Sequence, residues 1–285
     1  MTEYINDRIP WPYDKMDDYE SRYGITEKHE RLAEALEEFD RYCRGHGIQY
    51  SLGDGTLLGA MRHADFIPWD DDADVMMTRA EYLRLRETLN EKSGIKMFKI
   101  GFLDRFSTEK LLKTGEYIDV FINEEMPANR LVFRRKKFMT GFLRTGFRGL
   151  AENIRFREYS GGRRLLHRAI SGISGAFARL YADGRNLADL NERAVNLGRH
   201  KPSGIYTRYT SSMAETGLRF DKESYDAGYG DILFRGRKLM AIRNAKRFLK
   251  EMYGDFEQLP PEEKRIPEHP INMMESAERC IRRYN

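Results

Sequence analysis

The sequence predicts an α/β fold, in which a small mixed sheet carries helices on its faces. Short apolar runs of strand length alternate with longer stretches of helical periodicity. An acidic cluster leads into one of the apolar runs, and it contains Asp70, Asp71, Asp72 and Asp74. With 285 residues, the chain is long enough for one large domain or two small ones with an ample core.

We expect four parts along the chain. They are an N-terminal arm, a core, a basic helical insertion and a C-terminal part that completes the same domain: residues 1–25, 26–125, 126–204 and 205–285.

Composition places few limits on the function. The chain has 49 basic and 45 acidic residues, so its overall charge does not dictate a partner. Two cysteines, Cys43 and Cys280, are too few for a disulfide framework and fit a reducing compartment. The sequence has neither a signal-peptide pattern nor a run of 18 apolar residues. We therefore expect a cytoplasmic protein, either free or at the inner face of the membrane.

The first elements are an arm, a helix and a strand. Residues 1–25 lack periodicity, and Trp11-Pro12-Tyr13 is expected to pack on the domain. Apolar residues at helical spacing predict a helix from an N-cap at Thr26 to about Arg44. The apolar run at residues 48–52 predicts a strand.

A glycine-containing turn at residues 53–56 interrupts this strand. Glycine lets backbone N–H groups approach a ligand closely, and a helix opening at residues 57–61 attracts anions to its first turn. Gly55 and Thr56 are therefore candidate phosphate-binding residues.

The acidic cluster suits a metal ion. Alternation along a strand at residues 73–77 places Asp70, Asp72 and Asp74 on one face and Asp71 on the other. Three carboxylates on one edge repel each other unless a cation or solvent offsets their charge. Such hard oxygen ligands suit Mg²⁺, Mn²⁺ or Ca²⁺, and a solvated acidic loop is the alternative. An anion site beside a cation site is what phosphoryl transfer needs.

Further elements follow the acidic cluster. Thr78 and Glu81 form a capping box that predicts a helix to about Leu89. Strands are expected at residues 96–100, 111–113 and 116–122. Later helices are expected at residues 165–181, 187–196 and 241–252, and later strands at residues 205–210 and 231–234, with a turn at Arg235-Gly236.

Asp119 lies in the middle of the apolar strand at residues 116–122. A lone buried carboxylate is costly, so two interpretations remain. Asp119 either faces solvent or supplies a third carboxylate from the strand next to Asp72 and Asp74.

The segment from Arg130 to Arg168 holds twelve Lys or Arg residues and two Glu residues, interleaved with phenylalanine. It can recognise an anionic acceptor, contact a membrane surface, bind nucleic acid, or form a helical insertion with solvated arginines. We expect an acceptor site or a peripheral membrane contact here, and no nucleic-acid partner.

Three residues near the acidic cluster are further candidates for substrate binding. Arg62 can bind two phosphate oxygens at once, and His63 beside it can contact a donor phosphate. Trp69 belongs to the core or stacks on a nucleobase or a quaternary ammonium group.

Two motifs closely resemble those of the LicD family. The signature is GTLLGAMRH at residues 55–63 followed by FIPWDDDAD at residues 66–74, and a closing motif lies within residues 253–269. The resemblance covers roughly residues 26–121 and 239–269. Family members commonly read IDIFPLD where residues 118–124 read IDVFINE, so a role for Glu124 stays open.

This resemblance implies a nucleotidyltransferase-like fold and transfer of phosphocholine from CDP-choline to a cell-surface glycan, such as lipopolysaccharide or teichoic acid. Fukutin-type ribitol-phosphate transferases are related. Asp72 and Asp74, with help from Asp70, would hold Mg²⁺ or Mn²⁺, and Asp119 would complete the site or accept a proton. The partners would be a CDP-linked donor and a glycan or glycolipid acceptor. The rival functions are an Asp-x-Asp glycosyltransferase and, less well supported, a nucleic-acid-binding protein.

Overall fold

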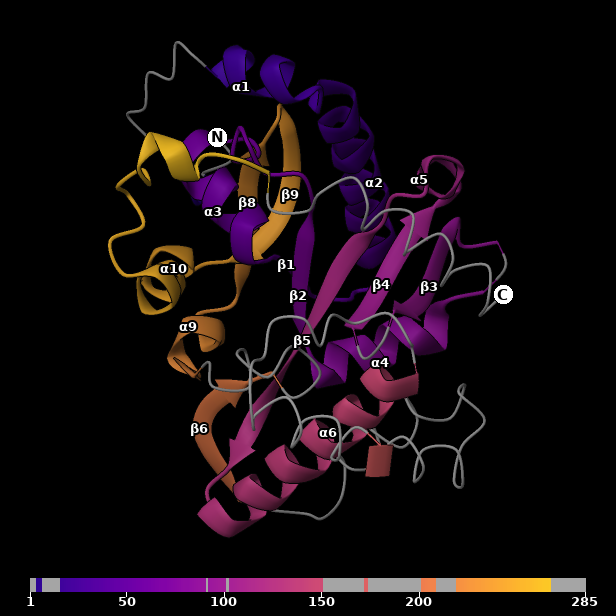
Figure 1. The fold of residues 1–285 in the computed structure, drawn as a ribbon, viewed down its shortest axis with the longest axis vertical. Helices are drawn as coiled ribbons and strands as arrows, with labels where there is room; N and C mark the ends of the chain where they lie inside the picture. Colours follow the sequence, from indigo (N-terminus) through magenta and orange to yellow (C-terminus); the bar gives the residue numbers. More distant parts are fainter. Residues whose placement is uncertain are drawn as a thin grey trace.

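The computed structural model describes residues 4–6, 16–90, 92–100, 103–150, 172–173, 201–208 and 219–267. Three predictions fall outside these ranges: the packing of Trp11-Pro12-Tyr13 and the helices at residues 165–181 and 187–196. Of the first helix, residues 172–173 are described, and they are helical. The fold is mixed α/β, with a curled mixed sheet flanked by helices, as predicted (Figure 1).

Five strands form the main path of the sheet. Their order is β1 (Ser51–Leu52), β2 (Asp74–Thr78), β5 (Ile118–Pro127), β4 (Leu103–Thr108) and β3 (Ile95–Ile100). Strands β2 and β5 are parallel, and the other neighbours along this path are antiparallel. The far half of β5 pairs with β6 (Pro202–Thr207), which pairs with β7 (Phe220–Asp221). A separate hairpin joins β8 (Tyr229–Phe234) to β9 (Arg237–Ile242).

The helices in the described ranges are α1 (Met16–Tyr23), α2 (Thr26–Gly45), α3 (Asp54–His63), α4 (Arg79–Thr88), α5 (Glu109–Thr114), α6 (Arg130–Leu150), α9 (Glu223–Asp226) and α10 (Ala245–Tyr253). A 3₁₀ turn spans Glu262–Lys264. The four-part division of the chain stays a prediction.

Helices α2 and α4 pack on one face of the sheet. Phe39 of α2 stacks on Phe106 of β4 with 4.2 Å between ring centroids, and the hydroxyl of Tyr82 on α4 donates a hydrogen bond to Asp104. Strand alternation puts Arg105, between these two β4 residues, on the opposite face. Because Arg105 pairs in register with Asp119, that opposite face carries the acidic residues.

Several predicted elements are confirmed. Helix α2 ends at Gly45, and α4 begins at the capping box, where Thr78 accepts a hydrogen bond from the Glu81 N–H at 3.4 Å. The Arg235-Gly236 turn closes the β8–β9 hairpin, with φ of 45° and 71° at its two residues.

Other predictions about the elements are wrong. Thr26 is not the N-cap of α2, because the buried Ile25 precedes the helix and its carbonyl accepts the His29 N–H at 2.9 Å. Residues 111–113 lie in α5, which Thr108 caps through its side chain and which ends at Thr114, with Gly115 as the C-cap.

The arm and the C-terminal part also differ from the prediction. Part of the arm is helical, as α1. The turn expected at residues 53–56 is the start of a helix: Gly53 is the N-cap of α3, and residues 54–56 lie in its first turn. Ala241 and Ile242 complete β9 because they pair with β8, so the following helix begins at Ala245. In the described part of the chain, we find no helix with the length and apolarity needed to cross a membrane.

Candidate active site

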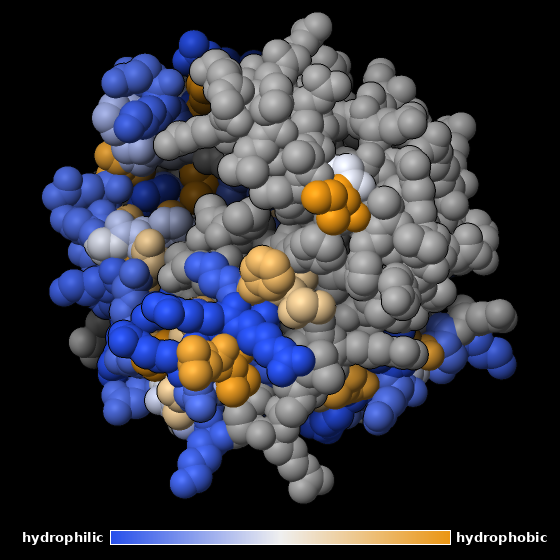
Figure 2. All heavy atoms as spheres, turned by 60° about the horizontal axis from the view of Figure 1, so that its bottom comes forward, coloured by the Kyte–Doolittle hydropathy of each residue, from blue (hydrophilic) through white to orange (hydrophobic). Residues whose placement is uncertain are grey.

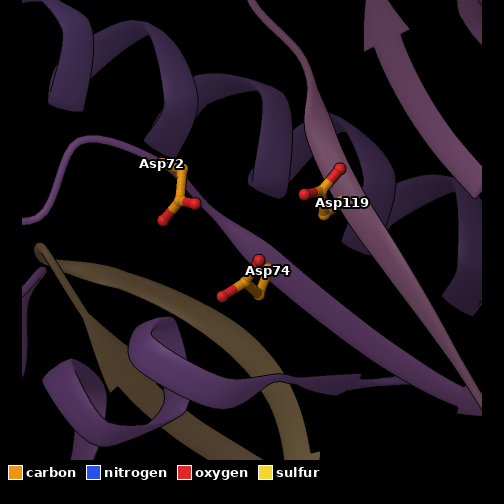
Figure 3. Close-up of side chains that lie close together, drawn as sticks. All are labelled: Asp72, Asp74 and Asp119. Carbon is orange, nitrogen blue, oxygen red and sulfur yellow. The ribbon is translucent and has the colours of Figure 1, made fainter. Parts of the chain in front are cut away.

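Three carboxylates converge on the sheet face opposite α2 and α4. Asp74 begins β2 and lies in register with Asp119 on the parallel strand β5, and Asp72 lies two residues before β2. One carboxylate oxygen of each residue lies within 4.8 Å of the others (Figure 3). The Asp119 N–H donates to the Ala73 carbonyl at 3.0 Å, which extends the pairing up to the acidic loop.

The pKa of Asp74 is strongly perturbed. Its side chain is buried, and burial raises its pKa well above the usual range. The neighbouring carboxylates raise the pKa further, in the order Asp72, Asp54, Asp119 and Asp70. A site that penalises negative charge so strongly, and offers only carboxylate oxygens, fits a hard divalent cation.

The first turn of α3 is attached to the start of β2. Thr56 is fully buried, and its hydroxyl accepts the Asp74 N–H at 2.8 Å, while the Gly53 N–H donates to the Asp74 carbonyl at 2.9 Å. The first N–H groups of a helix have no intrahelical acceptor, so this turn presents donors beside the carboxylates.

Asp70 lies over this turn and outside the three-carboxylate group. A Cβ at Gly55 would come 2.7 Å from Asp70 Oδ2, so any larger residue there would require the Asp70 side chain to move. The strand expected at residues 73–77 begins one residue later, because β2 starts at Asp74 and residues 70–73 form a loop, so the side that Asp70 and Asp72 share with Asp74 stays a prediction. Asp71 is buried, and its N–H donates to Asp70 Oδ1 at 3.1 Å.

Two arginines that the sequence did not single out contact the acidic residues. Arg105 of β4 forms an ion pair with Asp119, and its guanidinium lies 4.5 Å from the Tyr117 ring centroid. The fully buried Arg208, which follows β6, donates to both carboxylate oxygens of Asp54 at 2.6 and 2.7 Å. Arg208 lies in the strand expected at residues 205–210, whereas no element is expected at Arg105, so no motif marks either residue.

Of the other candidate substrate-binding residues, Arg62 and Trp69 are buried and His63 is half-buried. Arg62 is 3 % exposed, and its guanidinium donates to the Phe256 and Gln258 carbonyls at 3.2 and 3.4 Å. His63 accepts the Arg62 Nε–H at 2.9 Å, and burial, with the charge of Arg62, lowers its pKa to about 3. Trp69 is 7 % exposed and packs edge-on against Tyr19. The Arg62 hydrogen bonds connect the signature to the closing motif.

Comparison with known proteins agrees with this geometry. Residues 47–141 match the family described as LicD/FKTN/FKRP, nucleotidyltransferase domain. This range contains all three converging carboxylates. The chain carries a LicD-family nucleotidyltransferase domain.

Two curated relatives with different transferase names are similar to this chain. Lipopolysaccharide cholinephosphotransferase LicD of Haemophilus influenzae is 26% identical over 258 residues, which are 82% of this chain and 91% of the relative. Human ribitol 5-phosphate transferase FKRP is 51% identical over 73 residues, but these are 24% of this chain and 15% of that protein. Both relatives are phosphotransferases by name, which supports a transferase and phosphoryl-group transfer in general.

Proposed function

We propose that this protein transfers a phosphoryl-alcohol group, with phosphocholine as the first candidate, from a CDP-linked donor to a cell-surface glycan. The observation that carries the proposal is the group formed by Asp72, Asp74 and Asp119 beside the first turn of α3. The homology to a cholinephosphotransferase supports the choice of donor.

Two sets of residues would bind the CDP-linked donor. One set holds the cation, and the other donates hydrogen bonds to the phosphate oxygens. Asp72 and Asp74, with Asp119 close by, would hold Mg²⁺ or Mn²⁺, which when bound offsets the negative charge of the diphosphate. The backbone N–H groups at Gly55 and Thr56 would donate to phosphate oxygens. Arg62 and His63 would support this scheme from the closing motif, because Arg62 donates to the Phe256 carbonyl and to His63.

On the acceptor side, Asp119 would orient a glycan hydroxyl and accept its proton. The hydroxyl oxygen forms a bond to the β-phosphorus, and the bond from that phosphorus to the bridging oxygen breaks, so that CMP leaves. Arg105 would fix the Asp119 carboxylate through their ion pair. Catalysis would depend mainly on positioning the hydroxyl and the diphosphate and on offsetting the negative charge of the phosphates.

The Asp-x-Asp glycosyltransferase remains the rival, since Asp72 and Asp74 have that spacing. A third carboxylate in register on a parallel strand and the two phosphotransferase relatives favour phosphoryl transfer.

The test is to incubate the purified protein and a mixture of bacterial glycolipids with CDP-choline, CDP-ribitol or UDP-sugars, with and without Mg²⁺. We expect Mg²⁺-dependent CMP release and a phosphoryl-alcohol group on the acceptor in mass spectra. Transfer of a sugar from the UDP donors, with no reaction of the CDP donors, would overturn the proposal.

A further inference from the structure

Helix α6 has a buried face that attaches it to the sheet. Phe133, Lys136 and Thr140 are at most 9 % exposed and recur at helical spacing. Phe133 packs with Met126 of β5 and Ile205 of β6. This anchored face fixes which side of the helix points outward.

The outward face exposes two large apolar side chains. Leu131 is 73 % exposed and Phe138 is 69 % exposed, and their spacing of seven residues puts them on one side of the helix. Arg134 and Arg135 lie between them on the same side and are also exposed.

The charge of this face has a single sign. Arg130, Arg134, Arg135 and Lys137 are all exposed, and residues 126–151 contain neither Asp nor Glu. In Figure 2, which brings the α6 end of the molecule forward, apolar surface lies directly against strongly hydrophilic surface.

We propose that the outward face of α6 docks on an anionic lipid membrane, with Leu131 and Phe138 entering the headgroup region and the four cations contacting lipid phosphates. Amphipathic helices that lie in the membrane interface combine exposed apolar residues with Lys and Arg in this way. Each cation near an anionic surface strengthens binding about fivefold.

Nucleic acid is the weaker interpretation of the same face. Phosphate contacts would engage the cations, and Phe138 could stack on a base. Leu131 would gain little from a base or a phosphate, whereas in lipid both apolar side chains leave water. The membrane proposal does not depend on the reaction proposed above.

The experiment is co-sedimentation of the full chain with phosphatidylcholine vesicles, with and without phosphatidylglycerol. We expect binding to the anionic vesicles that weakens with salt. The Arg134→Glu/Arg135→Glu variant should bind them at least about 25-fold more weakly. Leu131→Ser/Phe138→Ser should weaken binding to the anionic vesicles at least about tenfold, although it leaves the charge unchanged.

Lys92→Glu/Lys113→Glu is the matched control, because both lysines are exposed, lie outside α6 and give the same change in net charge. Thermal melts should show that all three variants are folded. Equal loss of vesicle binding in this control would overturn the proposal, since net charge alone would then explain the effect. Tighter binding to a single-stranded RNA than to anionic vesicles would overturn it in favour of a nucleic-acid site.

Discussion

Arg208 donates two hydrogen bonds to the carboxylate of Asp54, a residue 154 positions earlier in the chain. Asp54 begins α3 and is one of the carboxylates that raise the pKa of Asp74. Arg208 also donates through Nε to Asn123 of β5 at 2.9 Å. The buried arginine therefore ties the start of α3 to the strand that carries Asp119.

The first prediction concerns this ion pair. Arg208→Met should destabilise the fold by about 3–5 kcal/mol, because the half-buried Asp54 carboxylate loses the counter-charge of a fully buried arginine. Asp54→Asn in the same chain should recover part of the loss. Denaturant unfolding of both single variants and the double variant measures the coupling. Strict additivity of the two changes would contradict the energetic link.

Removing charge from the acidic group should separate activity from stability. Asp72→Asn and Asp74→Asn should each lower kcat by at least about 100-fold. In EDTA the melting temperature of each variant should equal or exceed that of the parent, because the carboxylates repel one another and burial penalises their charge. Thermal melts with EDTA and with Mg²⁺ check this. A clearly lower melting temperature in EDTA would show that these carboxylates stabilise the fold without a cation.

Asp119→Asn tests the acceptor side of the site. It keeps the shape of the side chain and deletes its charge, so kcat should fall by about 10²–10⁴-fold while donor affinity changes much less. Turnover and donor titration on the same preparation measure the two effects. Near-parental turnover would exclude Asp119 from the chemistry and would favour the two-carboxylate glycosyltransferase.

Substitution by alanine should affect stability differently at two glycines of α3, Gly55 and Gly59. A Cβ at Gly59 would lie 2.5–2.9 Å from backbone atoms of residues 65–67. Gly59→Ala should therefore lower the free energy of unfolding by at least about 1–3 kcal/mol. At Gly55 the neighbour is the end of the Asp70 side chain, which can move. Gly55→Ala should therefore lower activity with little loss of stability. Comparable melting temperatures for the two variants would contradict this contrast.

Glu20 makes stability depend on pH. Burial alone would raise its pKa, but hydrogen bonds from His29 and Arg235 outweigh this effect and lower the pKa to about 2. The stabilisation, about 1–2 kcal/mol after solvent screening, is present above pH 4.5 and lost as the pH falls toward 2. Glu20→Gln should be less stable than the parent at pH 7 by this amount.

Unfolding curves between pH 7 and pH 3 should show the Glu20→Gln difference shrinking in acid. A constant difference across this range would mean that packing, and not the charge, stabilises the contact. The same contact supports the acidic loop, because His29 bridges Glu20 Oε1 and the Asp70 carbonyl oxygen at 2.7 and 2.6 Å.

Predictions from local pattern succeeded where a local cause dominates. The capping box at Thr78 and the Arg235-Gly236 turn both depend on hydrogen bonding or φ values within a few residues. The short run at residues 111–113 was misassigned because three apolar residues fit a strand or a helix equally well, and the Thr108 cap decides for the helix. Residues 241–242 were misassigned because pairing with β8 outweighs helical spacing.

The sequence by itself determined the mixed α/β class, the signature and closing motif of the LicD family, and the acids that are candidates for the site. These features depend on residue types and short spacings, which a linear chain displays directly. Only the tertiary structure decided that Asp72, Asp74 and Asp119 converge while Asp70 lies over α3, and that Arg62 and Trp69 are buried. It also decided the pairs Arg105–Asp119 and Arg208–Asp54. Such contacts depend on strand register and on burial, because both bring together groups that the linear sequence holds far apart.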